Sequence, residues 1–327
     1  MQAKRYALGL GVGIGFFLLI LDGRTALSGA AAGIELCIKS VIPALFPFFV
    51  LSDVLVSSLW GSRSALLRPL GRLFAMPAGT ESILLSAFLG GYPMGAKEIS
   101  RAYEAGHLKK EDALRLLTFC NQPGPAFLFG MVGPCLPKRW MAWVMWGIIL
   151  VSALFVSLLT RPGTARAELP ARKLPTPASV MGSALRCMGS VCGWVIVFRV
   201  AAAFLDRWAL CFLPSVWKTA VLGALELSNG CCMLCQIPDA RGRFLLATGM
   251  LSFGGLCITM QTVSFLGKLP VKTYLWGKVL QTGFALALSC AAVYGHVWYC
   301  MVPAILAVIL LFRKKAVAFS QKPLYNG

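Results

Sequence analysis

Apolar residues run in long blocks along this chain, and polar residues gather in short segments between the blocks. The clearest uninterrupted blocks are Tyr6–Leu21, Trp140–Thr160 and Val297–Phe312. The hydrocarbon core of a bilayer is about 30 Å thick, and roughly 20 apolar residues of α-helix cross it. The pattern therefore predicts a series of membrane-spanning helices.

Three further blocks are long enough to cross a membrane. They are Gly33–Trp60, Ser179–Leu205 and Thr273–Tyr294. The first contains Pro43 and Pro47, and proline inside a helix removes a backbone hydrogen bond and clashes with the preceding turn. We expect this helix to be kinked or broken.

Two blocks are interrupted near their middle and are too polar in part for ordinary spans. Ser82–Gly106 is broken at Gly90-Gly91-Tyr92-Pro93, so that its first arm would form about 15 Å of helix, half of the hydrocarbon core. Thr219–Ile237 is broken in the same way at Ser228-Asn229-Gly230. Both segments predict re-entrant hairpins that enter the membrane and return to the same side.

Two more helices are expected to cross the membrane with a break at about half depth. One begins at Lys109 and meets Asn121-Gln122-Pro123-Gly124-Pro125, and the other, Phe244–Phe265, meets Phe253-Gly254-Gly255. The order span, hairpin, broken helix, span thus occurs twice. We predict an all-α polytopic membrane protein with about eight full transmembrane helices and two re-entrant hairpins in two inverted repeats.

The predicted organisation has five parts. They are an N-terminal transmembrane helix (1–32), a first repeat (33–160), a cytoplasmic linker (161–178), a second inverted repeat (179–294), and a C-terminal transmembrane helix with a basic tail (295–327).

Composition and charge agree with a membrane protein. Of all residues 58% are hydrophobic and 13% are charged, and the mean hydropathy is +0.75; a soluble domain carries about a quarter charged residues. A net charge of +19 in a soluble protein would suggest nucleic acid. Here the basic residues favour the expected cytoplasmic loops by about three to one, as the positive-inside rule requires. We expect a lipid bilayer as partner, no nucleic acid, and both termini in the cytoplasm.

The breaks are the candidate substrate site. Irregular backbone at membrane depth is tolerated where it is buried in protein or lines a watery cavity, and helix N-termini can hold anions. Glycines can instead serve close helix packing, and amides can link helices. The candidate substrate-binding residues are Gly91, Tyr92, Pro93, Gly95, Asn121, Gln122, Gly124, Arg199, Ser228, Asn229, Gly230, Gly254, Gly255 and Gln261.

Glu226 is the sharpest single candidate because a carboxylate at the midplane costs several kcal/mol unless it is paired. It could couple transport to a proton or sodium ion, or form a structural ion pair with Arg199 or Lys278. Arg199 could meet an anionic substrate or extend toward the membrane surface. Glu35 and Lys39 have the spacing of a helical ion pair.

No motif supports enzyme catalysis, a cofactor or a metal site. The twelve cysteines are scattered through apolar segments, where we expect them to behave as small apolar side chains. Cys231, Cys232 and Cys235 are closely spaced, but no second cysteine pair or histidine accompanies them. The run Gly91–Lys97 lacks the spacing of a nucleotide-binding loop.

The chain resembles a known family at these same breaks. The runs Gly90–Lys97 and Phe119–Pro125 resemble the sporulation integral membrane protein YlbJ family, whose members carry nucleoside-recognition (Gate) repeats. The runs Glu226–Gly230 and Ser252–Gly255, with Gln261, are also similar. The likeness extends over most of the chain between the first and the last predicted helix.

The resemblance implies a role in endospore formation, in the outer forespore membrane, with dipicolinate as the proposed cargo. A rigid dianion of this kind would suit opposed helix N-termini and a basic residue. We therefore expect a secondary transporter of a small organic anion, with possible coupling to a proton or sodium. A nucleoside or ion carrier of the same type and a non-transporting scaffold for spore-envelope assembly are the alternatives; the sequence does not set the oligomeric state.

Overall fold

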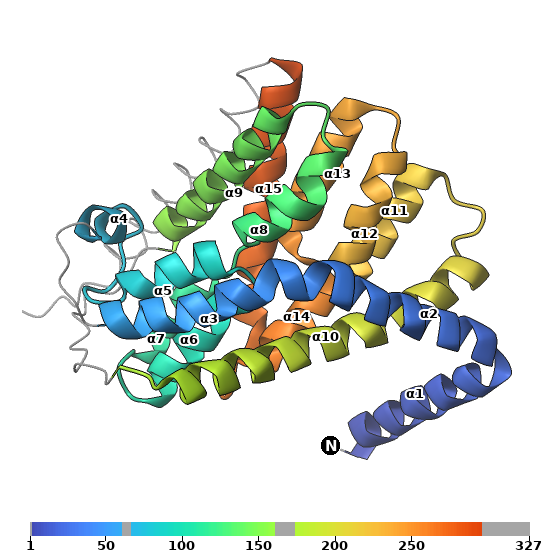
Figure 1. Ribbon diagram of the computed structural model, residues 1–327, viewed down its shortest axis with the longest axis horizontal. Coiled ribbons are helices and arrows are strands. Elements are labelled where there is room, and N and C mark those ends of the chain that lie inside the picture. Colours follow the sequence, from blue (N-terminus) through green and yellow to red (C-terminus); the bar gives the residue numbers. More distant parts are fainter. Residues whose placement is uncertain (1, 61–66, 161–173, 296–327) are drawn as a thin grey trace, which may run out of the picture.

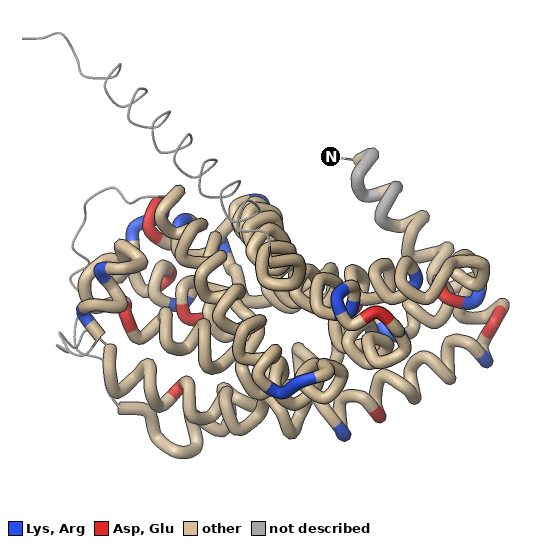
Figure 2. Tube along the Cα trace, turned by 90° about the horizontal axis from the view of Figure 1, so that it is seen from above, with Lys and Arg blue, Asp and Glu red and all other residues tan. Residues whose placement is uncertain are grey.

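The computed structural model describes residues 2–60, 67–160 and 174–295, and every regular element in these ranges is a helix. Figure 1 shows two long helical rods, α2–α3 and α10, lying side by side beneath a group of shorter and steeper helices. Figure 2 shows long uncharged stretches between the charged positions of the trace, as expected for helices that face lipid. The protein is an all-α polytopic membrane protein.

The first part of the chain forms helix α1 and the rod α2–α3. Helix α1 (Gln2–Leu21) leads into α2 (Gly23–Leu36), whose N-cap Asp22 accepts a hydrogen bond from the Thr25 amide. A π-helical turn, η1 (Cys37–Val41), joins α2 to α3 (Ile42–Leu59) without interruption. Of the two expected outcomes, a broken helix is excluded, because the helix continues through Pro47; the wider π-turn ends one residue before Ile42-Pro43. A kink at this point stays a prediction.

The rest of the first half contains the predicted hairpin and broken helix. The elements are α4 (Arg68–Leu73), α5 (Glu81–Leu85), η2 (Ser86–Gly90), α6 (Met94–Glu104), α7 (Lys110–Leu117), α8 (Pro125–Phe127), η3 (Leu128–Val132), η4 (Gly133–Cys135) and α9 (Arg139–Leu159). Helix stops between Gly90 and Met94, and again between Leu117 and Pro125. Both interruptions lie where the sequence predicts them.

The second half has the same order of elements. It consists of α10 (Pro177–Trp208), α11 (Ser215–Leu225), α12 (Leu227–Met233), η5 (Leu234–Gln236), α13 (Ala240–Phe253), α14 (Gly255–Val263) and α15 (Val271–Tyr294). Helices α11 and α12 are separated at Glu226, and α13 and α14 at Gly254. The predicted break at Ser228-Asn229-Gly230 was wrong: these residues are helical in α12, and the interruption lies at Glu226, which is extended and caps α12. The inverted relation between the halves stays a prediction.

Five helical segments are long and apolar enough to cross a membrane within the described ranges. They are Gly23–Leu59, Arg139–Leu159, Pro177–Trp208, Ala240–Val263 and Val271–Tyr294. The apolar stretch Gly9–Leu21 of α1 is shorter, as are the arms around the breaks. The expected last span, Val297–Phe312, lies outside the described residues, so the count of eight stays a prediction.

Small residues let the two rods approach each other closely. Gly29 and Gly33 lie four residues apart on α2 and face Val200 and Ile196 of α10. A Cβ at either glycine would come within 2.9 Å of the α10 backbone, so a larger residue would push the rods apart. This small-residue spacing is a common device for packing helices in membranes.

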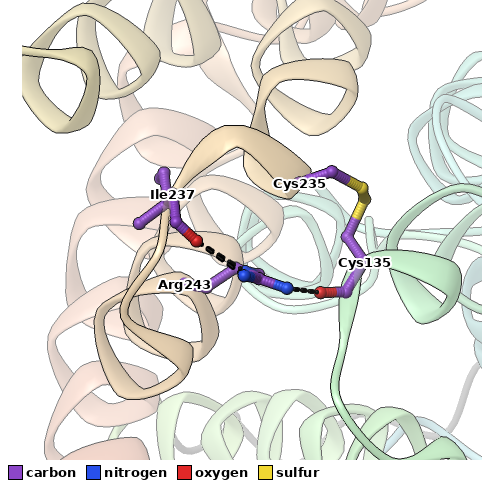
Figure 3. The surroundings of a disulfide bond; sticks show 4 residues. All are labelled: Cys135, Cys235, Ile237 and Arg243. Carbon is purple, nitrogen blue, oxygen red and sulfur yellow. Dashed lines mark hydrogen bonds between the residues drawn. A yellow bond between two sulfur atoms is a disulfide. The ribbon is translucent and has the colours of Figure 1, made fainter.

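A disulfide bond links the two halves near one end of the molecule. Cys135 in η4 is bonded to Cys235 in η5 (Figure 3). Arg243 stabilises the junction, donating to the Cys135 carbonyl at 2.5 Å and to the Ile237 carbonyl at 2.6 and 3.1 Å. From the sequence, cysteines in apolar segments were expected to behave as small apolar side chains, and this disulfide bond was not predicted.

Candidate functional site

Three of the four helix breaks line one small cavity, and the fourth, at Gly254, packs against Tyr92 in its wall. The volume of the cavity is about 20 Å³, room for a single water molecule. Five predicted site residues contribute to its wall; these are Tyr92, Gly124, Glu226, Ser228 and Gln261. Pro123 and apolar side chains of α3, α10 and α14 complete the wall. The structure therefore brings together residues that lie up to 169 positions apart in the sequence.

The tip of the first hairpin packs directly on the break of the next helix. Gly91 has a φ of +77°, and a Cβ there would lie 2.9 Å from the Gly124 nitrogen. Both the left-handed backbone and the close approach require glycine at position 91. The two breaks of the first half thus form one wall of the cavity.

Tyr92 connects this wall to the second half. Its hydroxyl donates a 2.9 Å hydrogen bond to the Leu251 carbonyl, in the last turn of α13. Gly254, which ends α13 in a left-handed conformation, would place a Cβ 3.5 Å from the Tyr92 ring. A larger residue at either contact would separate the two halves.

The amides of the second break make two different kinds of contact. The Asn121 side chain donates to the Thr262 hydroxyl of α14 at 3.0 Å, whereas Gln122 forms a reciprocal pair with Gln281 of α15 at 2.6 and 3.0 Å. Gln122 is therefore engaged with other protein groups and does not line the cavity. Its contacts favour the helix-linking interpretation over substrate binding.

Glu226 caps a helix and is not held by a basic side chain. Its two carboxylate oxygens accept hydrogen bonds from the Ser228 and Asn229 amides at 2.9 and 2.6 Å. The residue is 1% exposed and lines the cavity. Within the described part of the chain, neither Arg199 nor Lys278 forms a salt bridge with it. The carboxylate already occupies the N-terminus of α12, where an anionic substrate was expected.

Arg199 reaches the same hairpin through a neighbour of Glu226. Its guanidinium donates to the side-chain oxygen of Asn229, and it is close enough to Glu226 to interact electrostatically. Its Nε has no hydrogen-bond partner among the described residues. Arg199 is thus drawn inward, and the alternative in which it extends to the surface is not what the structure shows.

The remaining candidates serve the packing of the breaks. A Cβ at Gly95 would collide with the Cys120 carbonyl, one at Gly230 with Gly223, and one at Gly255 would lie 2.9 Å from the Ala224 carbonyl. Pro93 is buried at the N-cap of α6. These residues shape the cavity without contributing polar groups to it.

Gln261 is the polar group most available to a ligand. It lines the cavity, is 1% exposed, and donates only to the sulfur of Cys257, at 3.3 Å. Its Oε1 atom has no hydrogen-bond partner among the described residues. A buried amide oxygen without a partner is costly in a core, and Gln261 therefore leaves an unused acceptor in a residue of the cavity wall.

Lys278 is a site residue that the sequence analysis considered only as a partner of Glu226. It is 1% exposed, and its Nζ donates to the Tyr92 hydroxyl, the Asn121 carbonyl and the Gln281 side chain at 3.1, 3.1 and 2.9 Å. In ranges 2–60, 67–160 and 174–295, no carboxylate pairs with it. The sequence signal that could have identified this residue is a lysine within a predicted membrane-spanning helix.

Comparisons with known proteins agree with the family suggested by the motifs. The chain is 24% identical, over 345 aligned positions, to the sporulation integral membrane protein YlbJ of Bacillus subtilis (strain 168). The alignment covers 94% of this chain and 81% of that protein. No protein-family model and no solved structure matches the chain. Similarity along nearly its whole length to a YlbJ protein confirms the resemblance of this chain to the sporulation integral membrane protein YlbJ family.

Proposed function

We propose that this protein is a secondary transporter of a small organic anion, with dipicolinate as the substrate, and that it acts in endospore formation. The B. subtilis relative is named a sporulation integral membrane protein, which supports the sporulation role. Nothing in the proposal requires a catalytic step or a cofactor. The proposed location is the outer forespore membrane, with both termini in the mother-cell cytoplasm.

One observation carries the proposal: three helix breaks line a cavity, the fourth packs on its wall at Tyr92, and Tyr92 contacts a buried lysine, Lys278, that has no carboxylate partner among the described residues. Interrupted helices that meet near the midplane are the usual construction of substrate sites in secondary transporters. A scaffold has no need for irregular backbone there, because each break exposes polar groups that must be satisfied inside the membrane.

The charges around the cavity favour an anion. Lys278 supports the Tyr92 hydroxyl from behind the cavity wall, and Arg199 lies next to Glu226 and Asn229. Since Glu226 is the only acidic residue that lines the cavity in the described part of the chain, these two cations leave a net positive charge near it. A bound dicarboxylate would compensate the charge of Lys278, and the amide of Gln261 would orient it.

The enclosed volume means that transport requires movement. Small-molecule sites usually occupy about 300–1,000 Å³, and the cavity holds about 20 Å³. The structure is therefore a closed state, and substrate entry requires the two hairpins to separate. The bond from Tyr92 to the Leu251 carbonyl crosses between the halves and has to break when they do.

A neutral nucleoside is a second candidate because uncharged amides are prominent at the site. The Gln261 Oε1 and Asn121 Oδ1 atoms have no partner among the described residues. Nucleoside bases present donors and acceptors that such groups could bind. A nucleoside would leave the buried charge of Lys278 without compensation, which is why we favour the anion.

The proposal is tested by uptake of labelled dipicolinate into proteoliposomes. We expect saturable uptake by the wild type and at least a tenfold loss in Glu226→Gln. Proton and sodium gradients are imposed separately to identify the coupling ion, and labelled nucleosides are run in parallel. Saturable uptake of nucleosides without uptake of dipicolinate would overturn the anion assignment, and no uptake of either would favour the scaffold.

Asp239→Asn is the matched control for this experiment. Asp239 caps α13 by accepting from the Arg241 and Gly242 amides at 3.2 and 2.7 Å, as Glu226 caps α12, but it is exposed. Both substitutions weaken a helix cap, by about 1 kcal/mol. Only Glu226→Gln changes the cavity, so a similar loss of uptake in both variants would assign Glu226 a purely structural role.

A further inference from the structure

A second and much larger cavity lies at the end of the molecule where α10 begins. Its volume is about 510 Å³, and α3, α6 and the first turns of α10 form most of its wall. The lining residues are Asp53, Ser57, Lys97, Arg101, Pro175, Ala178, Ser179, Val180, Gly182, Ser183, Arg186 and Phe265. We call it the basic vestibule.

The charge of the vestibule is mainly positive. Lys97, Arg101 and Arg186 line it, and among the described residues Asp53 is the only acidic one in its wall. Arg101 also lies 3.9 Å from the buried carboxylate of Glu98. The vestibule thus keeps an excess of positive charge, and a cleft of one sign concentrates ions of the opposite sign.

Lys97 is held at the back of the vestibule by groups from two other helices. Its ammonium lies 3.3 Å from the Asp53 carboxylate of α3 and donates to the Ser183 hydroxyl of α10 at 2.7 Å. Ser179 and Ser183 lie on the same face of α10 as Arg186, because these positions are four and three residues apart. The vestibule thus runs along the first turns of α10.

The vestibule lies directly below the central cavity. On α10, Arg186 lines the vestibule and Val191 lines the central cavity, a rise of about 7.5 Å. On the first hairpin, Lys97 lines the vestibule and Tyr92 lines the central cavity. Between the two levels, the Cys187 sulfur contacts the Met94 sulfur at 3.9 Å, and both residues are fully buried. This apolar contact separates the two cavities in the closed state.

We propose that the basic vestibule is a docking site at which a small dicarboxylate or similar oxyanion is held before it passes the Met94–Cys187 contact into the central cavity. The passage into the central cavity rests on the proposed function; the anion-binding property does not. Lys97, Arg101 and Arg186 would contact the anion, and Ser179 and Ser183 would supply hydroxyl groups.

The charge of the vestibule can be measured by cysteine modification. Ser179→Cys places a thiol in the vestibule, and Ser215→Cys places one at the exposed start of α11, as a matched control. Both variants are full-length and also carry Cys211→Ser and Cys232→Ser, which remove two exposed native thiols. The rate of labelling of each variant is measured with an anionic and with a cationic methanethiosulfonate of similar size. We expect the anionic-to-cationic rate ratio to be about tenfold higher at position 179.

Substitution and competition then identify the ligand. Arg101→Gln and Arg186→Gln should each lower the ratio at position 179 toward that at position 215, whereas Arg139→Gln, at the exposed start of α9, should not. Millimolar dipicolinate or inorganic phosphate should slow modification of Ser179→Cys in detergent without anionic lipid. Equal ratios at the two positions would overturn the proposal, as would protection by phosphatidylglycerol nanodiscs alone, which would indicate a lipid headgroup site.

Uptake measured on the same variants separates this inference from the proposed function. If the vestibule serves transport, Arg186→Gln raises the KM for dipicolinate severalfold and leaves the maximal rate unchanged. Charge-selective labelling without any dipicolinate uptake would support the docking site and reject the carrier. Uptake by a protein that shows no charge selectivity would reject the docking site alone.

Discussion

Lys278 approaches Tyr92 in two ways, with its ammonium 3.1 Å from the phenol oxygen and 5.1 Å from the centre of the ring. Tyr92 in turn donates to the Leu251 carbonyl. A cation on α15, the tip of the first hairpin and the end of α13 are therefore connected through one side chain. A change in the charge or position of Lys278 therefore acts, through Tyr92, on the hydrogen bond to Leu251 that connects the two halves.

Removing the Tyr92 hydroxyl should weaken this connection without unfolding the protein. Tyr92→Phe keeps the ring in the cavity wall and loses the bonds to Leu251 and Lys278. We expect dipicolinate uptake to fall at least tenfold and the free energy of unfolding by about 1–3 kcal/mol, because two buried polar partners are left unpaired. Tyr103→Phe is the control, since Tyr103 lies outside the cavity on α6. Wild-type uptake by Tyr92→Phe would contradict the role of the hydroxyl.

Replacing Lys278 should separate function from stability. A buried cation without a carboxylate partner lowers stability, and a similar-sized apolar residue is often neutral or stabilising. We expect Lys278→Met to lose uptake of dipicolinate while its melting temperature in detergent is unchanged or higher. The exposed Lys272 on the same helix, changed to Met, should leave uptake unaffected. A strongly destabilised Lys278→Met would show that the lysine is a structural residue.

Three of the four break positions could be predicted from the sequence because local chemistry determines them, whereas the break at Glu226 was placed at Ser228-Asn229-Gly230 instead. Gly91 and Gly254 end their helices with positive φ, and the run from Asn121 to Pro125 cannot continue a helix. Each of these signals is local and needs no knowledge of the fold. The fact that three breaks line one cavity and the fourth packs on its wall depends on tertiary packing, which the sequence suggests only through the repeated order of elements.

Partners across the fold could not be predicted in the same way. Cys135 and Cys235 are separated by 100 residues, and nothing in their spacing distinguishes them from the other ten cysteines. An ion pair with Arg199 or Lys278 was one of the roles considered for Glu226, but the carboxylate accepts hydrogen bonds from two amides of the helix that it caps. The basic vestibule was missed because its three cations come from two helices far apart in the chain.

Arg115 should prove essential for folding although it is remote from the cavity. It is 6% exposed, and its guanidinium donates to four carbonyls, those of Phe74, Ala75, Ser157 and Thr160, at 2.6–3.1 Å. It thereby joins the loop after α4 to the end of α9. We expect Arg115→Met to lower the free energy of unfolding by more than about 3 kcal/mol, since buried carbonyls lose a charged donor. Uptake per folded molecule should stay near that of the wild type, and a denaturant titration compared with Arg139→Met measures the difference.

The disulfide provides a test of orientation. In the predicted topology Cys135 and Cys235 both lie on the non-cytoplasmic side, and disulfides persist in oxidising compartments. A membrane-impermeant phosphine reductant added to intact cells should therefore cleave the bond. Impermeant thiol reagents should label Ala240→Cys under the same conditions, and Pro170→Cys only after permeabilisation. Labelling of both positions from one face would overturn the inverted arrangement.

The same bond should also stabilise the contact between the halves. In the chain-entropy model a link that closes a loop of this length limits the unfolded state strongly, and removal of a native disulfide costs about 2–5 kcal/mol. Cys135→Ser should lower the melting temperature of the purified protein, and reduction of the wild type should lower it by a similar amount. Cys211→Ser, at an exposed free cysteine, is the control. Because the bond joins η4 to η5 and not the moving tip at Tyr92, we expect dipicolinate uptake by Cys135→Ser to persist below its melting temperature. A loss of uptake there would show that the two halves must stay linked at this end for the hairpins to separate at the other.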